Sequence, residues 1–226
     1  MFKINKLNKF SNYSYIIAEI GINHDGKIRK AYKLIDLAKK SGADAVKFQI
    51  FKPETFAVKK SEKTNQQKKL TKNTETLHDM FKRVSFGEKQ IKLVRKRAKK
   101  RKLEFMCSVF DEESLRIAKK VGIDAIKIAS SDISDLNLIK RISKLKKIVI
   151  ISSGMANQNE LLKALKILKK NTIYVLHCVS MYPTKISDIN LLRMLEIKRK
   201  FNVNIGFSDH TIGTDASIAA ISLGAK

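Results

Sequence analysis

Short apolar runs alternate with amphipathic segments along nearly the whole chain. The runs predict parallel strands that are buried on both faces, because such strands lack the polar alternation of half-exposed ones. They span residues 15–18, 45–48, 104–107, 125–128, 148–151, 173–176 and 204–207. The segments between them place apolar residues three or four positions apart, which predicts helices. These helices are expected near 29–41, 88–101, 112–121, 136–145, 158–169, 190–201 and 215–223.

This alternation predicts a parallel α/β fold. No glycine-rich dinucleotide turn follows the first strand, so a TIM-type (β/α) barrel is favoured over a doubly wound sheet. Residues 1–226 are therefore expected to form a single, incomplete (β/α)8-type barrel domain, with seven strand–helix units and no eighth strand. The connection 51–86 is much longer than the others, and we expect it to form a lid or a substrate wall on the catalytic face.

The composition is that of a globular protein, with 43% hydrophobic residues. No stretch approaches the roughly 18 uninterrupted apolar residues of a membrane span. Residues 1–10 lack the apolar core of a signal peptide, and Cys107 and Cys178 lie in apolar strand-like runs. We therefore expect a cytoplasmic protein with no membrane partner and no disulfide framework.

The formal net charge of +26 raises the question of nucleic-acid binding. The densest basic run is 95–102, but basic residues are also spread along nearly all of the predicted helices. Aromatic residues are not interleaved with them in the way that stacks bases. Nucleic-acid binding is therefore disfavoured, although a polyanion-binding protein stays open as an alternative. A positive field would equally attract a small anionic substrate.

Polar side chains stand at the carboxyl ends of the predicted strands, where barrel enzymes carry their catalytic residues. Lysines supply point charge and serine hydroxyls supply hydrogen bonds, which together suit a phosphate and a carboxylate. His177 is open to two interpretations, a buried structural histidine or a substrate contact. The strand-end residues are Glu19, Asn23, His24, Lys47, Gln49, Ser108, Lys127, Ser130, Asp132, Ser152, Ser153, Gly154, His177, Ser208, Asp209 and His210.

Six sequence blocks in this set resemble the N-acetylneuraminate (sialic acid) synthase family, which includes the legionaminic and pseudaminic acid synthases. They are IAEIGINHDG at 17–26, VKFQ at 46–49, KIAS at 127–130, SSGM at 152–155, LHCVSMYPT at 176–184 and GFSDHT at 206–211. The resemblance implies a transferase that condenses phosphoenolpyruvate with an N-acylmannosamine-type aldehyde to give a nonulosonic acid and phosphate.

The resemblance also implies roles for individual residues. Phosphoenolpyruvate would be bound by Lys47, Ser108, Lys127, Ser130, Ser152 and Ser208. The sugar would be lined by Glu19, Gln49, Tyr182 and Asn73, the last from the long connection. His210 would be one of two histidine ligands of Mn²⁺ or Mg²⁺, and Glu19, Asp132 and His210 would be catalytic. Asp132 stands where many family members carry glutamate.

The family pattern continues with an eighth strand that carries the second metal histidine, then a small antifreeze-like domain that acts within a homodimer. Neither is in this chain, so we expect the polypeptide alone to have little or no synthase activity. Two alternatives remain: another barrel that condenses phosphoenolpyruvate with an aldose, of the octulosonic or heptulosonic acid phosphate type, or an inactive polyanion-binding fragment. The particular nonulosonic acid and metal are left open.

Overall fold

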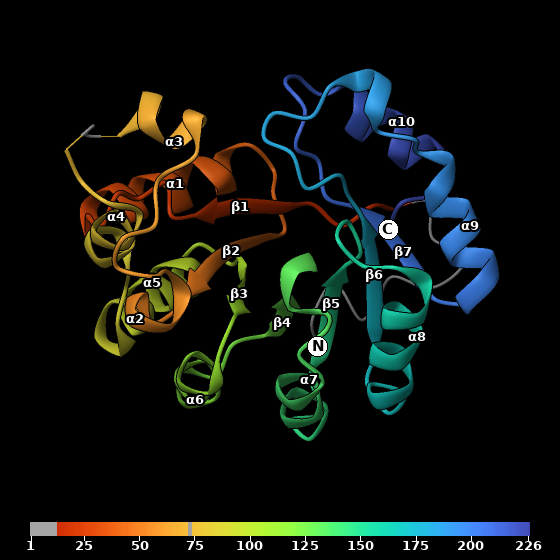
Figure 1. Cartoon of the computed structure of the whole chain (residues 1–226), viewed down its shortest axis with the longest axis horizontal. Coiled ribbons are helices and arrows are strands. Elements are labelled where there is room, and N and C mark those ends of the chain that lie inside the picture. Colours follow the sequence, from red (N-terminus) through yellow and green to blue (C-terminus); the bar gives the residue numbers. More distant parts are fainter. Residues whose placement is uncertain (1–12, 72–73) are drawn as a thin grey trace. The chain divides into compact units, whose positions relative to one another are not determined.

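The computed structural model describes residues 13–71 and 74–226, which form two compact units. The β1–β3 unit comprises Ile16–Ile123. The β4–β7 unit comprises Asp124–Lys226 together with the described residues before Ile16. Each unit is a parallel sheet with helices packed against it (Figure 1). The division into two units does not test whether the chain is a single domain, so that remains a prediction.

In the β1–β3 unit the strands pair in chain order, β1 with β2 and β2 with β3. This register places Lys47 beside Glu19 and Gln49 beside Ser108, so the polar groups of neighbouring strands gather at one edge. The elements are β1 (Ile17–Gly21), α1 (Ile28–Lys40), β2 (Ala45–Ile50), α2 (Pro53–Phe56), α3 (Asn65–Leu70), α4 (Leu77–Val84), α5 (Glu88–Lys100), β3 (Glu104–Val109) and α6 (Glu112–Val121).

In the β4–β7 unit the strands also pair in chain order and in parallel. The elements are β4 (Ala125–Ile128), a 3-10 turn η2 (Ser130–Asp132), α7 (Leu136–Ser143), β5 (Ile148–Ser152), α8 (Gln158–Ile167), β6 (Ile173–His177), a 3-10 turn η3 (Ile186–Asp188), α9 (Leu192–Phe201), β7 (Asn204–Phe207) and α10 (Asp215–Ser222). A doubly wound sheet would reverse its strand order at one point, and neither unit does. The predicted TIM-type fold class is thus confirmed, with seven strands in the described residues.

The predicted elements all occur, and their limits differ by a few residues. β2 and β3 run two residues further than predicted, because Gln49 and Ile50 continue the ladder with Ser108 and Val109. Lys47 therefore lies inside β2 and not at its end. The first strand begins at Ile17 instead of residue 15. The Tyr15 amide, which precedes the strand, donates to the Lys226 carbonyl at 2.6 Å.

Local capping explains where several helices begin and end. Asp111 and Asn157 accept hydrogen bonds from backbone amides of the first turns of α6 and α8. Gly122 ends α6 in the left-handed conformation, with φ of 75°, which a residue without Cβ adopts at little cost. None of the described helices combines the length and the apolar character that a membrane crossing requires.

The long connection 51–86 is not an extended loop, because it contains α2, α3 and α4. Its core is an aromatic cluster of Phe51, Phe56 and Phe81, which packs on Phe110 after β3, with contacting ring centroids 4.7 to 6.3 Å apart. Sequence periodicity missed these helices because each is shorter than the window in which a helical period is visible.

An arginine ties this connection to the loop after β1. Arg83 on α4 donates two hydrogen bonds to Glu75, at 3.0 and 2.8 Å, and forms an ion pair with Asp25. Next to Asp25, Gly26 has φ of +70°, and a Cβ built there would lie 2.2 Å from the Arg83 carbonyl oxygen. Only glycine therefore allows the two segments to approach this closely.

We expect Gly26→Ala to destabilise the protein by about 3 kcal/mol or more, because it combines a left-handed backbone with a clash against main chain. Gly42→Ala is the matched control, since Gly42 has φ of +84° but nothing within 4 Å of a built Cβ. It should lose only about 1 kcal/mol, the cost of the backbone conformation alone. Urea unfolding of both variants measures the difference. Equal losses would show that the contact with Arg83 has no energetic weight.

Candidate active site

In the β1–β3 unit, Lys47 is a buried cation held between two partners. Its side chain donates from Nζ to the Ser108 hydroxyl at 2.9 Å and forms an ion pair with Glu19. A buried charge is tolerated only when it is paired and hydrogen-bonded, and both conditions are met here. The Lys47 side chain is 10% exposed and that of Glu19 is 46% exposed, so the carboxylate faces the open side of this cluster.

Glu19 and Gln49 converge over the backbone of Gly21. A Cβ built on Gly21 would lie 3.0 Å from Glu19 Oε1 and 3.7 Å from Gln49 Nε2. The predicted sugar-binding pair of this unit is thus brought together, while Asn73 lies outside the described residues.

In the β4–β7 unit, Asp132 and Ser130 lie on the turn that follows β4. Burial raises the pKa of the Asp132 carboxyl, while a hydrogen bond from Ser131 and the positive charge of Lys127 act in the opposite direction. The Ser130 hydroxyl lies 3.0 Å from that of Ser180. Sequence reasoning gave Ser180 no role, and its only signal was its place inside the 176–184 block.

Ser152, at the end of β5, has a buried hydroxyl without a hydrogen-bond partner in the described part of the chain. The residue is 2% exposed. Leaving a buried donor unpaired costs about 1–3 kcal/mol, so such a group calls for an explanation. An acceptor oxygen from a bound anion would satisfy it.

His210 is fixed in one orientation. Its Nδ1 lies 2.6 Å from the Val179 carbonyl oxygen, which can only accept, so Nδ1 carries the proton. Its Nε2 then keeps a lone pair and lies 3.3 Å from the Ser208 hydroxyl. The Tyr182 ring lies 4.1 Å from the imidazole between centroids. A backbone carbonyl that orients a histidine in this way is typical of metal-ligating imidazoles.

His210 is suited to be one protein ligand of a divalent cation. No cluster of three or more His, Cys, Asp or Glu side chains with metal-binding geometry occurs among residues 13–71 and 74–226. Within the β4–β7 unit, the groups near His210 that could coordinate a metal are therefore its imidazole and the neighbouring hydroxyl and carbonyl oxygens.

Other strand-end residues form hydrogen bonds within the chain. Burial would raise the pKa of Asp209, but hydrogen bonds from Ser217 and Thr211 outweigh it and hold that pKa below its ordinary value. His177 bonds through Nε2 to the Ile189 carbonyl at 2.7 Å, which supports the structural interpretation left open above. Cys107 and Cys178 are buried free thiols, as expected.

Comparison with known proteins gives the family. The NeuB family profile matches residues 34–226. This chain belongs to the NeuB family. Its sequence is 40% identical over 215 residues to the N,N'-diacetyllegionaminic acid synthase of Campylobacter jejuni, a match that covers 93% of this chain and 64% of that protein. It is 34% identical to a pseudaminic acid synthase of the same species, over 94% of this chain and 63% of that one.

Solved structures agree with this membership. The N-acetylneuraminic acid synthetase of Leptospira borgpetersenii, in complex with citrate, is 33% identical with a TM-score of 0.84, covering 97% of this chain and 74% of that one. A truncated 3-deoxy-D-arabino-heptulosonate 7-phosphate synthase of Thermotoga maritima has a TM-score of 0.67 at 15% identity, which shows the fold alone. This NeuB chain spans about three fifths of the length of the curated relatives that it matches.

His24 should make stability depend on pH. The ring is 1% exposed, stacks on Phe86 at 3.8 Å and accepts a hydrogen bond from the Gly26 amide. Burial lowers its pKa to about 4, against the weaker opposing effect of Asp25. The unfolded chain, with an ordinary histidine pKa of about 6.5, binds the proton first. The free energy of unfolding should therefore fall between about pH 6.5 and pH 4, by about 3 kcal/mol at most.

Urea unfolding at several pH values measures this loss, and proton NMR of the imidazole gives the pKa directly. His24→Phe keeps the stacking on Phe86 and cannot titrate. Its free energy of unfolding should therefore not show the fall that His24 causes between about pH 6.5 and pH 4. If the variant and the parent chain lost the same stability over this interval, His24 would not be the group responsible.

Asp132→Asn should raise stability at pH 7 while it removes a group proposed below to transfer protons. Because burial raises the pKa of the Asp132 carboxyl, ionising it above the ordinary pKa of about 3.9 costs folding free energy. The amide has no such cost. The gain should disappear near pH 3, where the carboxyl is protonated in both states, and thermal unfolding at the two pH values checks this. A variant less stable than the parent at pH 7 would contradict it.

Proposed function

We propose that this chain carries the phosphoenolpyruvate-binding framework of a nonulosonic acid synthase, a transferase that joins phosphoenolpyruvate to an N-acylmannosamine-type aldehyde. The observation that carries the proposal is the buried Lys47 of β2, held by Ser108 and Glu19 of the two neighbouring strands. Family membership supports it, since named relatives are synthases of legionaminic and pseudaminic acids.

Phosphoenolpyruvate would be bound by ammonium groups and serine hydroxyls. In the β1–β3 unit, Lys47 and Ser108 offer an ammonium and a hydroxyl in fixed positions. In the β4–β7 unit we assign the same task to Lys127, Ser130, Ser152 and Ser208. The Ser152 hydroxyl, unpaired among the described residues, gains a partner when an anionic oxygen lies beside it. Charge-assisted hydrogen bonds of this kind are stronger than neutral ones.

The reaction needs proton transfers that Asp132 and Glu19 are suited to perform. The methylene carbon of phosphoenolpyruvate bonds to the aldehyde carbon, and the aldehyde oxygen takes up a proton. Water then adds to the resulting cationic C2 and loses a proton. The C2–O bond to phosphate breaks as the new hydroxyl gives up its proton to the departing phosphate and becomes the C2 ketone. A carboxyl whose pKa is raised by burial exchanges protons more readily near neutral pH than an ordinary aspartate.

His210 would hold Mn²⁺ or Mg²⁺ through Nε2, since its Nδ1 is committed to the Val179 carbonyl. When bound, such an ion polarises a carbonyl oxygen as a Lewis acid. We assign the sugar to Glu19 and Gln49, which converge over Gly21, and to Tyr182 and Asn73. We further propose that the enzyme is a cytoplasmic homodimer.

Calorimetry with phosphoenolpyruvate tests the binding framework in this chain. The parent chain should bind one equivalent. Lys47→Met and Lys127→Met should each weaken binding by about tenfold to a hundredfold, because each removes a charged hydrogen-bond donor. Lys140→Met removes an exposed lysine of α7 and should leave affinity nearly unchanged. An equal loss in all three variants, or no binding by the parent chain, would contradict the proposal.

Phosphoenolpyruvate labelled with ¹⁸O at the bridging oxygen tests the reaction itself. Any turnover should require an N-acylated hexosamine such as N-acetylmannosamine and a divalent metal, and should release phosphate that carries the label. Only a low rate is expected from this polypeptide, since it offers one imidazole to the metal. Label retained in pyruvate would indicate hydrolysis at phosphorus. Turnover with arabinose 5-phosphate or erythrose 4-phosphate, and none with N-acetylmannosamine, would favour the other class of aldose-condensing barrel.

A further inference from the structure

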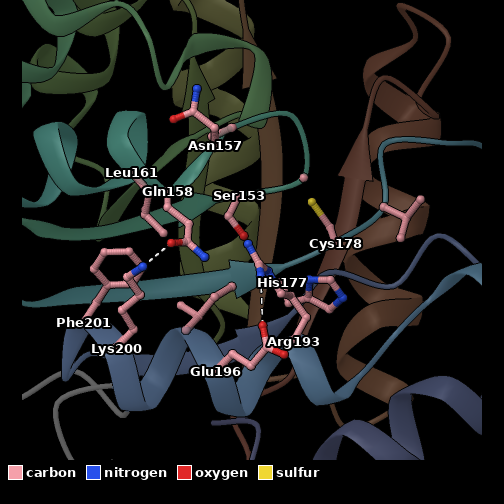
Figure 2. Close-up of a pocket in the computed structure, with 14 residues that line it drawn as sticks. Ser153, Asn157, Gln158, Leu161, His177, Cys178, Arg193, Glu196, Lys200 and Phe201 are labelled. Carbon is pink, nitrogen blue, oxygen red and sulfur yellow. Dashed lines mark hydrogen bonds and ion pairs between the residues drawn. The ribbon is translucent and has the colours of Figure 1, made fainter.

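A cavity of about 290 Å³ lies within the β4–β7 unit, and its lining includes none of the residues assigned above to phosphoenolpyruvate, sugar or metal. Figure 2 shows its walls: the N-terminal part of α8, the facing side of α9, and the turns that follow β5 and β6. Its size is close to the lower limit of small-molecule pockets, which is roughly 300 Å³. None of the roles assigned above uses it.

Arg193 on α9 extends into this cavity toward Ser153 (Figure 2). Its Nη1 donates to Glu196 at 2.8 Å, and within the described residues its remaining guanidinium donors have no partner. Lys200 also lines the cavity and donates to the side chain of Gln158. With Arg193 and Lys200 against the single carboxylate of Glu196, the lining has a net positive charge.

His177 supplies a second, independent indication of a ligand. The residue is 7% exposed and lines the cavity. Its Nε2 must carry the proton, because its partner is the carbonyl oxygen of Ile189 at 2.7 Å. In the neutral tautomer its Nδ1 has a lone pair on the side of the ring away from Ile189. A ligand that donates a hydrogen bond can bind to this acceptor on the cavity wall.

The remaining wall is apolar, formed in part by Leu161, Ile197 and Phe201. An open guanidinium fork matches the two oxygens of a carboxylate, the lone pair of His177 matches a hydroxyl, and the apolar wall matches a short hydrocarbon group. We propose that this cavity binds a small hydroxy-carboxylate with an apolar side chain.

Occupancy of the cavity acts on the turn that begins with Ser152. A Cβ built on Gly154 would lie 2.7 Å from Cys178 Sγ and 2.8 Å from Ser180 Oγ, so this turn packs tightly on the loop after β6. Ser180 in turn contacts Ser130. A ligand held between Ser153 and Arg193 therefore shifts the positions of the Ser152 and Ser130 hydroxyls, both of which are assigned to phosphoenolpyruvate. This coupling rests on the proposed function, whereas binding in the cavity does not.

The experiment uses phenyllactate as the probe and follows backbone amide shifts of the ¹⁵N-labelled chain. Shifts should concentrate at Ser153, Gly154 and Gln158. Phenyllactamide, which lacks the charge, should bind about tenfold more weakly or worse, and 3-phenylpropionate, which lacks the hydroxyl, should also bind more weakly. Arg193→Gln should lose about tenfold or more in affinity, while Glu196→Gln, which releases Arg193, should gain affinity.

Arg199→Gln is the matched control, because it makes the same charge change on the exposed side of α9 outside the cavity. If Arg193→Gln and Arg199→Gln lost the same affinity for phenyllactate, the site would be overturned. It would also be overturned if inorganic phosphate displaced the probe as well as unlabelled phenyllactate does, since either result means general anion attraction. Saturating phenyllactate should change the affinity for phosphoenolpyruvate at least about twofold in the parent chain and not in Arg193→Gln. An unchanged affinity overturns the coupling. A chain that binds phenyllactate but not phosphoenolpyruvate overturns the proposed function and leaves the cavity site standing.

Discussion

Parallel pairing in chain order is the constraint on which the arrangement of polar groups depends. All strands of a unit run the same way, so their carboxyl ends lie on the same edge, and whatever polar residue ends one strand meets those of its neighbours. The same register also pairs polar groups inside the strands, as Lys47 of β2 shows. Its register with Glu19 brings a carboxylate to a buried ammonium, and the Ser108 hydroxyl completes the set. Without these partners a lysine with so little exposure would be a cost to folding.

The repeating strands and helices could be predicted from the sequence because buried parallel strands and amphipathic helices have different periods. The strand-end inventory followed from the same reasoning, and it found Lys47, Ser108 and His210. What escaped prediction depends on contacts between distant residues. His24 stands beside Asn23 in a strand-end motif, yet the structure stacks it on Phe86 and keeps it neutral. The carbonyl of Val179 sets the tautomer of His210, and no pattern of side chains reports a backbone contact.

Some of the arginines in the densest basic run are held in internal ion pairs, which bears on the polyanion alternative. In the run 95–102, Arg101 and Arg97 hydrogen-bond to Asp36 of α1, and these contacts lower the pKa of that carboxyl to about 2. These two arginines therefore fasten α5 to α1 and are not free to follow a phosphate backbone. The densest basic segment of the chain thus has a structural use, and its charge density alone is weak support for nucleic-acid binding.

The turn after β5 shows how one short segment serves two faces of a sheet. Ser152 ends the strand with a buried hydroxyl that has no partner among the described residues, whereas Ser153 bonds to the carbonyl of Leu176 and lines the cavity beside Arg193. Successive residues of a strand point to opposite faces, so adjacent serines are directed to different environments. Gly154 then lets the chain pass against Cys178 without a side chain in the way. A displacement of this turn cannot be confined to one face, because its two serines share a peptide bond and the packing of Gly154 leaves little space for independent movement.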